Sequence, residues 1–120
     1  MKTKRLLAFD LGASNGRAVL GAFDGARIEL SEVHRFDNPM IEQNGLYYWD
    51  ALRLYRNLKE SFLKLKQEGH EADCFGIDTR GVDFGMIDQN GALLGNPRCY
   101  RNCTEAAMPH VHAILPQQEL

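Results

Sequence analysis

Two apolar runs separated by a short glycine-rich turn constrain the fold of this chain more than any other feature. Residues 5–10 form an apolar run ending in Asp10, which is typical of a buried strand that presents a carboxylate at its carboxyl end. The turn at residues 11–16 contains two glycines and Asn15, residue types that adopt positive φ. A second apolar run, residues 17–23, follows at once. The chain therefore begins with a strand, a tight turn and another strand.

The following segment extends this pair into a sheet. Asp24-Gly25 predicts a hairpin, and the alternation of Ile28 and Leu30 with polar residues predicts a third strand. The apolar phase changes near Ser31, which indicates a bulge there. Residues 36–48 contain several turn formers and predict an irregular excursion closed by a turn.

A helix is predicted after Asp50, which has the chemistry of an N-cap, and Gly69 should end it. Its apolar residues recur at helical spacing and should share one face: Leu52, Tyr55, Leu58, Phe62 and Leu65. Residues 74–78 form a short apolar run, and a strand after a crossover helix usually joins its sheet in parallel. This order of elements predicts an α/β fold, the first half of a ribonuclease-H-like mixed sheet.

The last third of the sequence is less regular. Residues 84–87 and 92–94 flank an Asn-Gly turn and predict a hairpin with a type I′ turn. Residues 104–115 predict a helix that starts late or is kinked, because Pro109 removes a backbone donor. Residues 116–120 look like the first turn of another helix, so we expect the chain to be part of a longer protein.

The composition is that of an ordinary globular segment, with 44% hydrophobic and 25% charged residues in a length of 120. A formal net charge of −2 disfavours nucleic acid and anionic membrane surfaces as partners. The first residues resemble the start of a signal peptide, but Asp10 interrupts the apolar run. No stretch approaches the roughly 20 apolar residues of a membrane span. We therefore expect a cytoplasmic protein.

Three cysteines without a CxxC pair predict reduced thiols and no disulfide framework. Four potential zinc ligands lie close in sequence: Cys99, Cys103, His110 and His112. Their spacing matches none of the common structural zinc signatures, so a small buried thiol and two solvated histidines are the preferred interpretation.

The decade of residues 8–17 contains the groups needed to bind a polyphosphate. Glycines allow the main chain to approach phosphate oxygens, Ser14 and Asn15 add polar donors, and Asp10 is suited to hold magnesium through water. Arg17 could pair with phosphate or with Asp10. The pattern is neither a Walker loop nor a dinucleotide fingerprint. Taken alone, the pattern favours a plain hairpin in which Asp10 caps the turn and the glycines only supply unusual φ.

Five collinear motifs resemble the N-terminal quarter of the rhamnulokinases, within the FGGY family of carbohydrate kinases. They are D-L-G-A-S-N-G-R at 10–17, H-R-F-D-N at 34–38, Q-N-G-L-Y-Y-W-D at 43–50, G-I-D-T-R-G-V-D-F-G at 76–85 and Y-R-N at 100–102. The resemblance implies that residues 1–120 are the N-terminal part of the first of two ribonuclease-H-like domains that flank a cleft.

The resemblance also implies a function, namely transfer of the ATP γ-phosphoryl group to the 1-hydroxyl of L-rhamnulose with Mg²⁺. The residues that would bind the ATP phosphates are Ala13, Ser14, Asn15, Gly16 and Arg17. Gly81 would contact the sugar, and Asp83 is a weaker candidate for the same role. The general base and the adenine pocket of the family would lie beyond residue 120, so we expect these residues alone to be inactive.

Three residues depart from the family pattern: Arg80 replaces a usual tryptophan, and Asn102 and Cys103 replace an aspartate and an arginine. The alternatives are therefore an FGGY kinase for another ketose or polyol, or a non-catalytic actin-like nucleotide-binding or assembly module. His34 has no nucleophilic partner nearby in sequence, which favours a structural role. Part of a domain leaves edges exposed, so self-association of the isolated chain is also expected.

Overall fold

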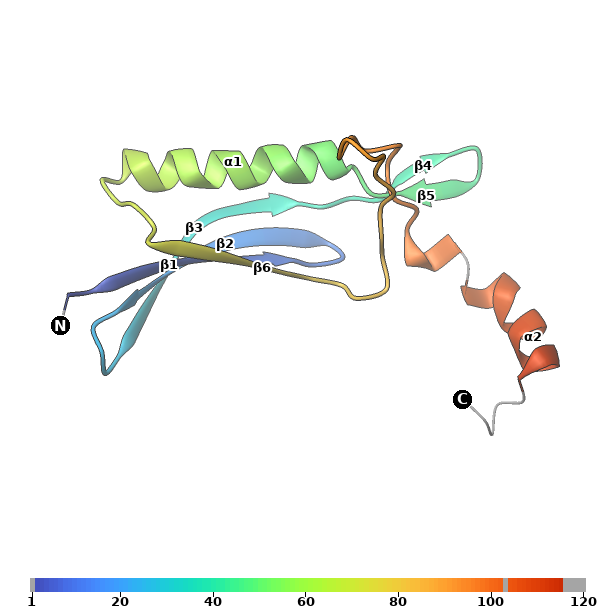
Figure 1. Ribbon diagram of the computed structural model, residues 1–120, viewed down its shortest axis with the longest axis horizontal. Coiled ribbons are helices and arrows are strands. Elements are labelled where there is room, and N and C mark those ends of the chain that lie inside the picture. The colour runs from blue at the N-terminus through green and yellow to red at the C-terminus, as the bar shows by residue number, and fades with distance from the viewer. Residues whose placement is uncertain (1, 103, 116–120) are drawn as a thin grey trace. The chain divides into compact units, whose positions relative to one another are not determined.

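The computed structural model describes residues 2–102 and 104–115 (Figure 1). Within this range the chain forms two compact units, the first made of residues up to 39 and 50–81, the second of residues 40–49 and those from 82 onward. The first unit contains a four-stranded sheet and the second a two-stranded sheet.

The first unit is a four-stranded sheet in the order β3-β2-β1-β6 with one helix, α1. The elements are β1 (Lys4–Leu11), β2 (Asn15–Phe23), β3 (Ile28–Asp37), α1 (Ala51–Gln67) and β6 (Cys74–Thr79). β1 pairs antiparallel with β2, β2 pairs antiparallel with β3, and β6 pairs parallel with β1. The predicted mixed sheet, with three antiparallel strands followed by a helix and a parallel strand, is confirmed.

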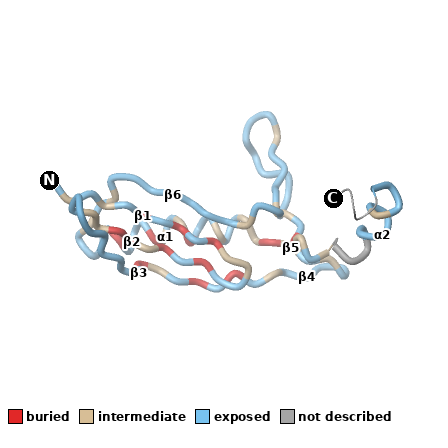
Figure 2. Tube along the Cα trace, turned by 90° about the horizontal axis from the view of Figure 1, so that it is seen from below, coloured by how far each residue is buried: buried red, intermediate tan, exposed pale blue. Residues whose placement is uncertain are grey.

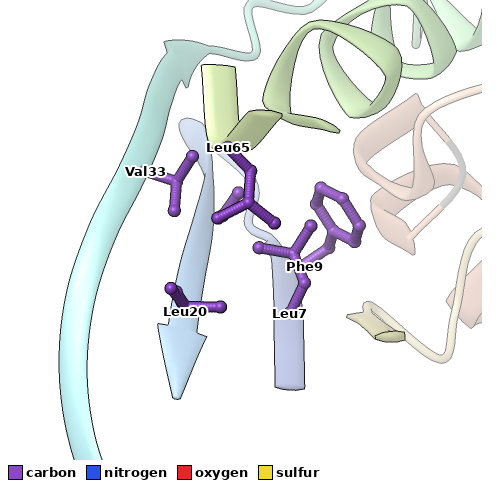
Figure 3. Close-up of a cluster of buried hydrophobic side chains, with 6 residues drawn as sticks. Leu7, Phe9, Leu20, Val33 and Leu65 are labelled. Atoms are coloured by element: carbon purple, nitrogen blue, oxygen red, sulfur yellow. The ribbon is translucent and has the colours of Figure 1, made fainter. Parts of the chain in front are cut away.

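The core of this unit lies between α1 and one face of the sheet, where apolar side chains of β1, β2, β3 and α1 meet (Figure 3). Leu7, Phe9 and Leu65 are at most 2% exposed, and burying each contributes about 1.5–3 kcal/mol. Phe9 also contacts the rings of Phe62 and Phe75, at centroid distances of 5.5 and 6.3 Å. The strand residues that alternate with the core residues are exposed on the opposite face.

The predicted bulge in β3 is present, two residues beyond Ser31. Ala18 pairs with His34 and Val19 with Glu32, so Val33 has no partner on β2. The extra residue turns Val33 into the core, where it is 8% exposed. The phase change in the apolar pattern was therefore the signature of this bulge.

Helix α1 has the predicted ends but not the predicted face. The Asp50 carboxylate accepts a hydrogen bond from the Arg53 amide, and Gly69 follows the helix with a φ of 78°. The buried residues of α1 are Asn57, Ser61 and Leu65, whereas Leu52 and Tyr55 are 69% and 60% exposed. The prediction of one apolar face was wrong for its first half, because β3 offers a polar partner, His34, to that part of the helix.

The second unit contains the hairpin of β4 (Ile41–Gln43) and β5 (Leu46–Tyr48), the 3₁₀ turn Tyr100–Asn102 and helix α2 (Thr104–Ile114). The predicted closing turn at Asn44-Gly45 is confirmed, but the irregular excursion over residues 36–48 was wrong, because β3 extends to Asp37 and β4 and β5 form a regular hairpin. Asn44 and Gly45 have φ values of 53° and 76°, both positive as a type I′ turn requires.

The second Asn-Gly pair behaves differently. A short hairpin does form, with a bridge between Ile87 and Leu93, but of Asn90 and Gly91 only the glycine has a positive φ, 83°. The expected type I′ turn is replaced by a turn in which the Asp88 side chain accepts from the amides of Asn90 and Ala92, at 2.8 and 2.9 Å. A side chain that satisfies the backbone locally removes the need for the primed turn.

Helix α2 begins at Thr104 and runs through Pro109, so the expectation of a late start was wrong. The proline removes one backbone donor, and the residues on both sides keep the helical conformation. Along the part of the chain that the structure describes, neither helix combines the length and the apolar character needed to cross a membrane.

Candidate phosphate-binding site

The turn between β1 and β2 is tight and lacks positive φ angles. Leu11 and Gly16 form the last pair of the ladder, and the Gly12 amide donates to the Asn15 carbonyl at 2.8 Å. Neither glycine nor Asn15 has a positive φ, so the expectation of unusual φ at these residues was wrong. The two glycines are required for space. A Cβ on Gly12 would lie 2.9 Å from the Asn15 carbonyl oxygen.

Gly16 is required by its neighbour on β3. A Cβ at this position would overlap the ring of Phe36, which is itself 8% exposed. The phosphate-binding candidates on either side of this glycine differ in exposure: Ser14, Asn15 and Arg17 are exposed, Ala13 is half-buried and Gly16 is buried. The turn therefore presents its polar side chains outward while its glycine packs on the adjacent strand.

Asn38, just beyond the end of β3, makes two hydrogen bonds to the turn. Its side-chain amide donates to the Gly12 carbonyl at 2.9 Å, and its backbone amide donates to the Ser14 carbonyl at 2.9 Å. Asn38 is 3% exposed. Sequence reasoning missed this residue, although the alternation of His34, Phe36 and Asn38 in the H-R-F-D-N motif places all three at strand positions of the same parity.

Asp10 and Arg17 lie opposite each other on β1 and β2 and form an ion pair. The Nε and Nη2 atoms of Arg17 are each 3.1 Å from Oδ2 of Asp10. Of the two partners left open by the sequence, the structure thus brings Arg17 to Asp10. The side chains are 46% and 52% exposed, so solvent screens the pair and it adds little stability.

A second carboxylate, Asp78, lies beside Asp10 because the two residues are partners in the parallel β1–β6 register. Asp10, Arg17 and Asp78 line a hollow of about 500 Å³ on the sheet face that α1 does not cover. Magnesium keeps most of its water and needs only one or two carboxylates, so this arrangement fits a water-mediated Mg²⁺ ion. No group of three or more His, Cys, Asp or Glu residues suited to a metal ion occurs within the described ranges.

The two predicted sugar contacts belong to different units. Gly81 closes the first unit, and a Cβ placed on it would meet no atom within 4 Å, so packing does not explain the glycine. Asp83 lies in the second unit, where its Oδ1 accepts a hydrogen bond from the Tyr100 amide at 2.9 Å. Part of the hydrogen-bonding capacity of Asp83 thus serves the local fold, and its role toward a sugar stays a prediction.

His34 has structural partners, as expected. Its Nδ1 accepts from the Lys64 ammonium group at 2.7 Å, so Nε2 carries the proton and donates to Oδ1 of Asn57 at 3.0 Å. Its ring also packs on Phe36, with centroids 5.5 Å apart. These contacts connect α1 with β3, and they account for the burial of Asn57.

Two of the three residues that depart from the family pattern contact residues far away in the sequence. Asn102 accepts from the Tyr47 amide at 2.7 Å and donates to the carbonyls of Tyr47 and Cys99, at 2.6 and 2.8 Å. A carboxylate could not make the two donor contacts. Arg80 approaches the Leu11 carbonyl at 3.5 Å, and Cys103 lies outside the described residues.

The thiols of Cys74 and Cys99 are free, the first exposed and the second buried. Sγ of Cys99 contacts Sδ of Met40 at 3.2 Å, and the described candidates for a zinc set form no metal-binding cluster. The preferred interpretation of Cys99 as a buried thiol is confirmed.

No family model matches the sequence, but individual proteins do. The rhamnulokinase of Bacteroides thetaiotaomicron is 39% identical over 99 residues, which cover 82% of this chain and 20% of that protein. The rhamnulokinase of Pectobacterium atrosepticum is 35% identical over 123 residues, covering 100% of this chain and 25% of that protein. The chain thus spans a fifth to a quarter of the length of these curated relatives.

Solved structures show the same fold. Gluconate kinase from Lactobacillus acidophilus has a TM-score of 0.70 at 15% identity, over 94% of this chain and 24% of that one. Xylulose kinase from the same organism has a TM-score of 0.72 at 13% identity, over 92% of this chain and 22% of that one. These neighbours confirm the actin/hexokinase-like α/β fold class. Over the part of their length that it spans, this chain is similar in sequence to the rhamnulokinases, a family of carbohydrate kinases.

Proposed function

We propose that the protein carrying this chain is an ATP-dependent sugar kinase that phosphorylates the 1-hydroxyl of L-rhamnulose, and that residues 1–120 are the N-terminal part of its first domain. The observation that carries the proposal is the β1–β2 turn, where exposed Ser14 and Asn15 lie beside the Asp10–Arg17 pair. The similarity to rhamnulokinases in the same residues supports the choice of substrate.

The residues of this chain act by positioning and charge. Backbone amides and polar side chains of residues 13–16 bind the ATP phosphates, and Arg17 places a guanidinium charge beside them. Asp10 would hold Mg²⁺ through water, and the bound ion would supply positive charge against the phosphate oxygens. Gly81 lets the sugar approach the main chain, and Asp83 offers a carboxylate oxygen to a sugar hydroxyl.

The reaction moves one phosphoryl group. The sugar hydroxyl oxygen forms a bond to the γ-phosphorus, the bond from that phosphorus to the β–γ bridging oxygen breaks, and ADP leaves with the electron pair. The hydroxyl proton passes to a general base that we place beyond residue 120. The 120 residues alone are therefore expected to be inactive.

A coupled assay of ADP release by the complete protein tests this function. L-Rhamnulose should support turnover better than xylulose or gluconate, and Asp10→Ala should lower it at least a hundredfold. Asp24→Ala is the matched control, because Asp24 is an exposed carboxylate on the other turn of β2 and should leave turnover unchanged. Absence of ketose-dependent ADP release from the unmodified protein would refute the proposal. Faster turnover of another sugar would favour an FGGY kinase of different specificity, with Arg80 as the first residue to examine.

We also propose that the isolated chain self-associates. Every residue of the edge strand β6 is exposed (Figure 2), and Phe75 and Ile77 are 59% and 49% exposed. An apolar strand with an unpaired edge is a template for pairing with another chain. Light scattering should detect species larger than a monomer, and a uniform monomer would contradict the idea.

The free thiols fit the cytoplasmic location that we propose for the complete protein.

A further inference from the structure

We propose that Asn38 is a positioning residue that shapes the β1–β2 turn for nucleotide phosphate, although it need not touch the nucleotide itself. This inference rests on the proposed function, because it assigns a role in ATP binding. Asn38 is 3% exposed and makes two hydrogen bonds to the turn, one from its side chain and one from its backbone.

The two hydrogen bonds orient two peptide groups. In a trans peptide, the carbonyl of one residue and the amide of the next point in opposite directions. The Gly12 and Ser14 carbonyls both point to Asn38, at 2.9 Å each, and the described chain contains no cis peptide. The amides of Ala13 and Asn15 are therefore directed away from Asn38. These residues are two of the predicted phosphate ligands. Asn38 thus orients two backbone amides of the proposed phosphate site.

The turn has one backbone hydrogen bond of its own, from the Gly12 amide to the Asn15 carbonyl, and the two contacts of Asn38 add to it. Gly12, Asn15 and Gly16 lack the positive φ angles of a primed hairpin turn. Phe36 supplies a second contact from β3, since its ring occupies the space that a side chain on Gly16 would fill. Contacts from β3 and from Asn38 beyond its end thus help to set the shape of the turn.

The chemistry of the side chain is specific. The contact with the Gly12 carbonyl requires an N–H or O–H donor, so an ionised aspartate at position 38 would bring a carboxylate against a carbonyl oxygen in a buried place. A protonated aspartate would again donate. Burial beside a carbonyl favours the protonated form, so the defect should lessen as the pH falls.

The test compares Asn38→Asp with Asn57→Asp in the complete protein. Both asparagines are buried, at 3% and 8% exposed, but Asn57 contacts Arg53 and His34 rather than the turn. ATP affinity is measured by calorimetry with Mg²⁺ between pH 8 and pH 5.5. Hydrogen exchange of the backbone amides of residues 12–16 is measured without nucleotide.

Asn38→Asp should weaken ATP binding about tenfold at pH 8, with the ratio to the unmodified protein moving toward one at pH 5.5, and should speed exchange in the turn. Asn57→Asp should change ATP affinity less than about twofold at either pH. Equal weakening by both variants, or unchanged affinity and exchange in Asn38→Asp, would overturn the proposal. If the unmodified protein binds no ATP, the proposed function fails instead, and the exchange data alone show whether Asn38 holds the turn.

Discussion

The two hairpin turns that flank β2 are built in different ways. The turn after β2 is self-contained, because the Asp24 carboxylate accepts from the amides of Ala26 and Arg27 at 2.8 Å each, and Gly25 adopts a φ of 104°. The turn before β2 has no positive φ and is held by Asn38, from beyond the end of β3.

This difference separates a turn that only reverses the chain from one that has polar groups available. In the turn after β2, the Asp24 side chain forms its hydrogen bonds with the backbone of the same turn. In the turn before β2, Asn38 donates hydrogen bonds to the Gly12 and Ser14 carbonyls. The exposed side chains of Ser14 and Asn15 are therefore not needed for these contacts. Local sequence rules describe the turn after β2 well, whereas the contacts of the turn before β2 are explained only by the fold.

The largest expected effect on stability comes from adding a methyl group to the supported turn. Gly16→Ala should lower the free energy of unfolding by about 1–3 kcal/mol, because the new Cβ would overlap the Phe36 ring. Urea unfolding measures the change. Gly76→Ala is the control, since no atom lies within 4 Å of a Cβ there. The Phe36→Leu background should reduce the cost of the Gly16 change, and an unchanged cost would disprove the close contact.

An effect of comparable size should distinguish the two supports. Asn38→Ala should cost about 1–3 kcal/mol, because it leaves the Gly12 carbonyl without its buried donor. Asp24→Ala should cost less, since its turn is exposed and water replaces the lost hydrogen bonds. Thermal and urea unfolding of both variants would show the order. A larger loss from Asp24→Ala would reverse our comparison of the turns.

The smallest effect is a pH dependence confined to the self-contained turn. Hydrogen bonds from the Arg27 and Ala26 amides lower the pKa of Asp24 below its usual value. A lowered folded-state pKa stabilises the protein above the unfolded pKa of about 3.9, and this stabilisation is lost as the pH falls through the folded value. The stability gap between the unmodified protein and Asp24→Asn should therefore narrow in acid.

The gap to Asn38→Ala should not follow the same titration, because the Asn38 side-chain amide does not ionise. Urea midpoints at pH 7 and pH 3 give both gaps. A gap for Asp24→Asn that widens in acid would show that the Asp24 carboxylate does not stabilise the turn.

The sequence predicted features that depend on neighbours in the chain. The helix ends at Asp50 and Gly69, the succession of three antiparallel strands, a helix and a parallel strand, and the bulge near Ser31 all follow from local patterns, and the structure confirms them. The buried face of α1 was not predictable in the same way. Asn57 and Ser61 are buried because His34 and the helix backbone satisfy their polar groups, and that depends on which strand the helix meets.

The candidate site shows the same division. Asp10 and Arg17 were identified from the glycine-rich turn, but only the strand register established that they pair. Asn38 was missed because its contacts reach 26 residues back along the chain. Asn44-Gly45 and Asn90-Gly91 are the same dipeptide, yet only the first forms a turn with two positive φ angles. At the second, the Asp88 side chain accepts hydrogen bonds from the turn backbone and a different turn forms. Competing side-chain contacts therefore decide what short motifs form.

Hydrogen exchange with and without ATP and Mg²⁺ tests the central claim most directly. In the complete protein, nucleotide should slow exchange of the backbone amides of residues 12–17 and leave those of residues 24–27 unchanged. Unchanged exchange at residues 12–17 under saturating nucleotide, or equal slowing at both turns, would contradict the assignment of the β1–β2 turn as the phosphate site.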